Sequence, residues 1–136
     1  GFQEMVTYCR RRGFRFVIVS NGLDFYIEET MNGIGLEDIE ILSAKTRFSP
    51  EGLQVYYVGP DGKYLDDDFK GTYVNEFLGE GYRVIYVGNG TSDIIASRQC
   101  QHIFATGNLL NYFQKTNLDY TPFTHFNEII KVLERW

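Results

Sequence analysis

The sequence has few cysteines and no long apolar run. Its two cysteines, Cys9 and Cys100, lie far apart and form no CxxC pattern, so neither a disulfide framework nor a zinc site is predicted. No stretch approaches the roughly 18 consecutive apolar residues of a membrane span, and the chain does not open with the charged and then apolar pattern of a signal peptide. We therefore expect a reduced, cytoplasmic protein that does not bind membranes.

An excess of basic residues is also absent. The chain has 13 Lys and Arg residues against 18 Asp and Glu residues, which gives a net charge of −5. This balance argues against a dedicated surface for nucleic acid or anionic lipid. The basic cluster of Arg10, Arg11, Arg12 and Arg15 falls at the end of a predicted helix, where positive charge favours the helix dipole and faces water.

The length indicates one domain. A chain of 136 residues that is 43% hydrophobic can bury a core of its own. The first residue is Gly1 rather than methionine, and a helical pattern is already under way at Phe2. We therefore expect the sequence to be part of a longer protein.

Apolar spacing predicts alternating helices and strands. Helices are expected over residues 2–12, 23–34, 68–78, 93–100, 108–115 and from 126 to the end, where Thr124 is a candidate N-cap. Strands are expected over residues 14–20, 41–48, 53–58, 82–87, 102–105 and 120–123. The order predicts an α/β protein with a three-layer α/β/α, Rossmann-like parallel sheet and a β-hairpin insertion, with functional loops at the carboxyl ends of the strands.

Polar residues of particular types stand where those strands end or helices begin. Ser20 ends a strand, Lys70 opens a helix, and Asn89 and Asp93 follow the strand over residues 82–87. A hydroxyl with free backbone N–H groups, an ammonium and a carboxylate are the components of a phosphoryl-transfer site, because phosphate binds donors and positive charge while Mg²⁺ prefers oxygen ligands.

The order of these motifs resembles that of the haloacid dehalogenase superfamily of phosphatases. IVSNG, at residues 18–22, resembles the second motif of that family, Lys70 resembles the third, and VGNGTSD, at residues 87–93, resembles the fourth. SNGLDFYI and the closing stretch FATGNLLNYF to YTPFTHFNEI are similar to the phosphoserine-phosphatase branch, in particular to 2-hydroxy-3-keto-5-methylthiopentenyl-1-phosphate phosphatases. The resemblance covers essentially the whole chain.

The resemblance implies roles for specific residues. Ser20, with the backbone of Asn21 and Gly22, would hold the phosphoryl group of a small-molecule phosphomonoester, and Lys70 would offset negative charge there. Asp93 would bind Mg²⁺ directly or through water. Asn89 departs from the family, which usually has aspartate in that place; an amide oxygen can ligate a hard cation but brings no charge.

The first motif of the family, a strand ending in DxDx[TV], has no counterpart in the expected place. That motif supplies the nucleophilic aspartate, without which no aspartyl-phosphate intermediate forms. We therefore expect a Mg²⁺-dependent phosphatase whose nucleophile lies outside this chain, so that the chain alone is inactive. DFKGT, at residues 68–72, only partly resembles the motif, because Lys70 replaces its second aspartate.

Two other interpretations remain open. Loss of the nucleophile together with Asn89 would also suit a non-catalytic domain of the same fold. A nucleotide-binding or S-adenosylmethionine-binding domain would use the loop at residues 87–93 as its glycine-rich turn. That interpretation requires an acidic residue at the end of the next strand, where Thr106, Gly107 and Asn108 stand instead.

Overall fold

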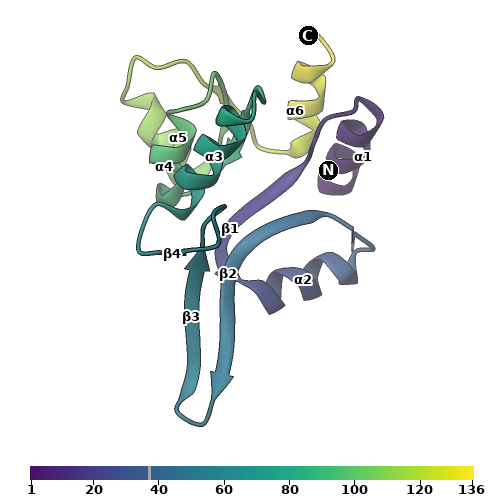
Figure 1. Ribbon diagram of the computed structural model, residues 1–136. Coiled ribbons are helices and arrows are strands. Elements are labelled where there is room, and N and C mark those ends of the chain that lie inside the picture. Colours follow the sequence, from purple (N-terminus) through teal and green to yellow (C-terminus); the bar gives the residue numbers. More distant parts are fainter. Residues whose placement is uncertain (37) are drawn as a thin grey trace.

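The computed structural model describes residues 1–36 and 38–136 and has two sheets among its helices (Figure 1). The first sheet has the order β1-β2-β3-β4, and its strands are β1 (Val17–Leu23), β2 (Glu40–Ser49), β3 (Gly52–Val58) and β4 (Tyr64–Leu65). β1 and β2 are parallel, joined through helix α2 (Asp24–Gly33), whereas β2, β3 and β4 are antiparallel. The expected hairpin insertion is therefore the extension of this sheet.

The second sheet is entirely parallel. Its order is β5-β6-β7, with β5 (Ile85–Gly88), β6 (His102–Ala105) and β7 (Thr121–Pro122). The remaining elements are helices α1 (Phe2–Arg11), α3 (Phe69–Gly79), α4 (Ile94–Ser97), α5 (Gly107–Gln114) and α6 (Phe126–Leu133), and the 3₁₀ turn η1 (Thr91–Asp93). The alternation of strands and helices along the chain matches the predicted α/β fold class.

Helices cover both faces of the parallel strands. On one face, α1 and α6 pack through Met5, Cys9 and Ile129 against a cluster that takes in Ile85 and Val87 of β5. On the other face, α3, α4 and α5 form a second cluster, against which Tyr86 and Val84 pack. Because neighbouring residues of a strand point to opposite faces, β5 contributes alternately to the two cores. The result is the expected three-layer arrangement, with β1 visible between the two groups of helices (Figure 1).

Some predicted boundaries were wrong. β1 begins later than expected and continues past Ser20 to Leu23, with an irregularity in its pairing after Val19. The N-cap of the last helix is His125 rather than Thr124, whose backbone N–H instead donates to the Glu128 carboxylate at 2.8 Å. The N-cap prediction failed because the carboxylate of the first turn, rather than the threonine hydroxyl, makes the hydrogen bond at this helix start.

No helix over the described part of the chain is long and apolar enough to cross a membrane.

Candidate functional site

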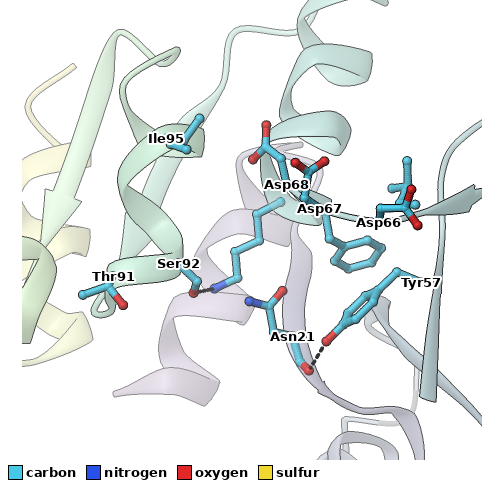
Figure 2. A pocket seen from close by; sticks show the side chains of 11 residues that line it. Asn21, Tyr57, Asp66, Asp67, Asp68, Thr91, Ser92 and Ile95 are labelled. Atoms are coloured by element: carbon cyan, nitrogen blue, oxygen red, sulfur yellow. Dashed lines mark hydrogen bonds between the residues drawn. The ribbon is translucent and has the colours of Figure 1, made fainter. Parts of the chain in front are cut away.

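A pocket lies where strand ends of the first sheet approach the loop that follows β5. Its volume is about 340 Å³, and its walls come from β1, β3, the start of α3 and the turn η1. Figure 2 shows Asn21 on one side, Thr91 and Ser92 on another, and the acidic residues Asp66 to Asp68 along the rim. The pocket is therefore assembled from segments that are far apart in the sequence.

Lys70 lines this pocket from the first turn of α3. Its ammonium donates hydrogen bonds to Oγ of Ser92 at 3.0 Å and to Oδ1 of Asp93 at 2.7 Å. Only 14% of the Lys70 side chain and 5% of the Asp93 side chain are exposed. The structure therefore brings together the residues predicted as the third and fourth motifs in a largely buried ion pair.

The carboxylate of Asp93 is the centre of a hydrogen-bond network. Oδ1 accepts from Lys70 and from the Tyr86 hydroxyl, at 2.6 Å from the latter. Oδ2 accepts from the backbone N–H groups of Asn89 and Gly90 at 3.0 and 2.9 Å. Burial opposes ionisation of this group, but the hydrogen bonds from Lys70, Tyr86 and Gly90 outweigh it, so the pKa of Asp93 lies below its ordinary value.

Two glycines, Gly88 in β5 and Gly107 at the start of α5, leave room for this network. A Cβ placed on Gly88 would lie 2.8 Å from the Asp93 carboxylate. Gly107, which has φ +56°, would bring a Cβ to 2.7 Å from the backbone oxygen of Asn89. That oxygen also accepts a hydrogen bond from the N–H of Asn108 at 3.0 Å. The backbone of Asn89 is therefore held from both sides.

The segment Ser20, Asn21 and Gly22 lies within β1, close to its carboxyl end. The Gly22 N–H donates to Oγ of Ser20 at 3.0 Å, and the Tyr57 hydroxyl donates to the backbone oxygen of Asn21 at 3.0 Å. Asn21 lines the pocket with Lys70, whereas Ser20 and Gly22 are not among its lining residues. The structure thus places Asn21 directly at the pocket and Ser20 one residue away along the strand.

The residues predicted to hold Mg²⁺ do not form a complete metal site on their own. Both oxygens of Asp93 are already engaged by four donors, and the other predicted ligand, Asn89, carries no charge. Within residues 1–36 and 38–136, no three His, Cys, Asp or Glu side chains are grouped closely enough to hold a metal ion. In the arrangement seen here Asp93 holds Lys70 and the loop, and a cation would require further ligands.

The acidic residues Asp66, Asp67 and Asp68 line the pocket and directly precede α3. Asp68 is the N-cap residue and has φ 49°, in the left-handed region. A Cβ on Gly71 would overlap only with the Asp68 carboxylate, which is the end of an exposed side chain. Negative charge is favourable directly before the first turn of α3, although the Asp68 side chain makes no capping hydrogen bond.

Sequence reasoning missed two side chains of the site. Tyr86 was assigned only to a buried strand, and Ser92 only to a loop. Strand alternation directs Tyr86 toward the face covered by α3 and α4, where its hydroxyl needs a partner because it is part-buried. A tyrosine inside an apolar strand next to the glycine-rich loop is the sequence signal that could have indicated a polar partner.

The chain is similar in sequence to a family of hydrolases and to curated phosphatases. The family model of the haloacid dehalogenase-like hydrolases matches residues 1–98. Among curated proteins, the 2-hydroxy-3-keto-5-methylthiopentenyl-1-phosphate phosphatase of Brevibacillus brevis is 23% identical over 99% of this chain and 62% of the relative. The enzyme of the same name from Geobacillus thermodenitrificans is 27% identical over the same shares of the two proteins.

A solved structure also matches. The chain aligns over 97% of its length with a phospho-aspartyl intermediate analogue of phosphoserine phosphatase, with a TM-score of 0.67 and 20% identity. At this identity the match concerns the fold. The chain spans about 62% of the length of this structure and of the two relatives named above.

Proposed function

We propose, since the chain belongs to the haloacid dehalogenase-like hydrolases, that it is the phosphate-binding part of a phosphatase that hydrolyses small-molecule phosphomonoesters. The observation that carries this proposal is the ammonium of Lys70, held by Asp93 and Ser92 at a pocket that Asn21 also lines. A cation fixed in a part-buried pocket is suited to the negative charge of a phosphoryl group. The curated relatives are phosphatases of a small phosphorylated ketone, which agrees with this substrate class.

The roles of the residues follow from their positions. Asn21, which lines the pocket, would donate to the phosphoryl oxygens from near the end of β1. The Ser20 hydroxyl, which accepts from the Gly22 N–H, lies one residue away along the strand and would support this segment. Lys70 would approach the same oxygens from the start of α3, and its bonds to Asp93 and Ser92 would limit its motion. Such fixed donors stabilise the transition state because they need no reorganisation as charge develops.

The chemistry that we propose needs a nucleophile from outside this chain. A carboxylate oxygen would attack phosphorus while the bond from phosphorus to the ester oxygen breaks, and the leaving alcohol would take its proton from an acid that, like the nucleophile, lies outside this chain. Water would then hydrolyse the aspartyl phosphate to release inorganic phosphate and restore the carboxylate. In this chain Lys70 and the end of β1 would hold the phosphoryl group through both steps.

Mg²⁺ is also part of the proposal, for the complete protein only. Asn89 could offer its amide oxygen, but the saturated Asp93 carboxylate leaves the residues present here short of a hard-cation site. The remaining ligands would have to come from the same outside segment as the nucleophile.

A second candidate function is a non-catalytic domain of the same fold. The specific observation that favours it is Asn89, which removes a charge from the loop, together with the closed network around Asp93. Phosphatase activity of a full-length form would exclude this candidate.

The direct test is release of phosphate from p-nitrophenyl phosphate with and without Mg²⁺. This chain and a full-length form are assayed side by side. We expect activity in the full-length form with Mg²⁺ and none in this chain. Activity of this chain alone would refute the proposal and direct attention to Asp68, whereas inactivity of both, also with physiological substrates, would favour the non-catalytic domain.

A binding test isolates the part that this chain does contain. Inorganic phosphate is titrated into the chain and followed by ³¹P nuclear magnetic resonance. Lys70→Met should weaken phosphate binding by about tenfold or more, as expected for loss of one charge-assisted contact. The control is Lys115→Met, which removes an exposed lysine outside the pocket. Equal binding by the two variants would contradict the role of Lys70.

A further inference from the structure

The segment of residues 20–22 interrupts the regular pairing of β1 with β2. The two strands pair in register up to Val19, and the pairing resumes only at Leu23. Over this stretch β1 advances by four residues while β2 advances by two, from Leu42 to Ala44. Such irregularities bend a strand and redirect its side chains. The ladder with β2 therefore does not by itself determine how residues 20–22 face the pocket.

Tyr57 reaches this segment from β3. Its hydroxyl donates a hydrogen bond to the backbone oxygen of Asn21 at 3.0 Å (Figure 2). That oxygen and the N–H of Gly22 belong to one planar peptide unit. The N–H end of the same unit donates to Oγ of Ser20 at 3.0 Å. Both ends of this peptide unit are thus held, and Tyr57 supplies the contact that comes from another strand.

Tyr57 is itself held firmly. In β3 it pairs with Leu65 of β4, and the preceding residue Tyr56 pairs with Lys45 of β2, so β3 is paired on both edges at this point. The ring of Tyr57 packs against the ring of Phe69, with 5.0 Å between the ring centroids. Phe69 is 6% exposed. The hydroxyl therefore projects from a backbone and a ring whose positions are both fixed.

The ring contact connects Tyr57 to the second part of the site. Phe69 directly precedes Lys70 in the first turn of α3, and Tyr57, Phe69 and Lys70 line the same pocket as Asn21. One side chain thus contacts β1 through its hydroxyl and the start of α3 through its ring. These are the two segments that carry the proposed phosphate donors. Donors stabilise developing charge best when their relative positions are fixed in advance.

We propose that Tyr57 is a positioning residue that sets the orientation of the peptide unit after Asn21 and the separation between Asn21 and Lys70. It acts through Asn21 and Phe69, because its hydroxyl proton is already used in the bond to the Asn21 backbone. This inference rests on the proposed function for its purpose, which is to arrange the two donors around a phosphoryl group.

The test uses Tyr57→Phe, which removes the hydroxyl and keeps the ring. Tyr73→Phe is the matched control. The Tyr73 hydroxyl also donates to a backbone oxygen of β3, that of Val58 at 2.8 Å, and its ring also packs against Phe69, at 5.1 Å between centroids. Tyr73 is not among the residues that line the pocket. The control therefore removes an equivalent bond between α3 and β3 without removing the bond to Asn21.

The first measurement is hydrogen exchange of the backbone amides at residues 20–22 in the phosphate-free chain. Tyr57→Phe should speed this exchange about fivefold, as expected for loss of one hydrogen bond that limits local opening. Tyr73→Phe should leave it unchanged. Unaltered exchange in Tyr57→Phe, or equal acceleration in the control, would overturn the proposal.

The second measurement is titration with inorganic phosphate, followed through the side-chain amide resonances of Asn21. Tyr57→Phe should weaken binding about fivefold and change the shift that phosphate induces, whereas Tyr73→Phe should bind as the parent chain does. Binding by Tyr57→Phe equal to that of the parent chain would overturn the positioning role. If the parent chain itself binds no phosphate, the proposed function fails instead, and the exchange measurement still decides whether Tyr57 positions residues 20–22.

Discussion

The ion pair between Lys70 and Asp93 should be strongly coupled, and a double-mutant cycle can measure the coupling. At 2.7 Å between Nζ and Oδ1, and with an effective dielectric constant of about 20, the attraction is about 6 kcal/mol. Desolvation of the two largely buried side chains offsets a large part of it. We therefore expect a net coupling free energy of about 2 kcal/mol.

The single substitutions should differ in cost. Asp93→Asn also disturbs the bonds from Tyr86 and from the amides of Asn89 and Gly90, so we expect a loss of about 3 to 4 kcal/mol in the free energy of unfolding. Lys70→Met leaves those three donors on the carboxylate, and we expect a loss of about 1 to 2 kcal/mol.

The assay is urea unfolding of the parent chain, both single variants and the double variant. The double variant should be more stable than the sum of the single losses predicts, by the coupling free energy. Losses that add within about 0.5 kcal/mol would refute the inference that this pair acts as a unit. Equal m-values across the four proteins serve as the control, because a changed slope would indicate an altered unfolded or native state.

Three further predictions concern Asp93 and the residues that contact its loop. Tyr86→Phe should cost about 1 kcal/mol and raise the pKa of Asp93, which a carboxyl-detected nuclear magnetic resonance titration can follow; an unchanged pKa would contradict the hydrogen bond. Since the folded pKa of Asp93 is depressed, its stabilisation should be present above the ordinary value of 3.8 and be lost as the pH falls through the lower folded value. Asp93→Asn should flatten that acid dependence of the unfolding free energy, and an unaltered slope would assign it to other carboxylates. Gly107→Ala should destabilise the chain by about 1 to 3 kcal/mol, because a Cβ would meet the backbone of Asn89 at positive φ. Gly79→Ala, where a Cβ meets nothing within 4 Å, is its control in thermal unfolding and should cost nothing.

Much of the fold could be predicted from local pattern. Apolar spacing located α1 and α6, and turn residues located the hairpin of β2 and β3. These signals are local, because a helix or hairpin is specified by residues a few positions apart. The boundaries of β1 and the cap of α6 were wrong, since strand pairing and a competing carboxylate decide them.

The candidate site, too, was predictable from the sequence only in part. Motif order and the family resemblance predicted Ser20, Lys70 and Asp93 as site residues; the structure pairs Lys70 with Asp93, and Ser20 lies next to Asn21, which lines the pocket. Motif order could not show that Tyr86 and two backbone amides would saturate the Asp93 carboxylate, since that depends on distances between separate elements.

The sequence by itself determined the order of helices and strands and the residue types that stand at the strand ends, because both depend on neighbours along the chain. Only the tertiary structure decided that Lys70 pairs with Asp93 and that Asn21 and Lys70 line one pocket. These features join segments that are far apart in the sequence, and packing between layers, rather than local preference, determines where such segments meet.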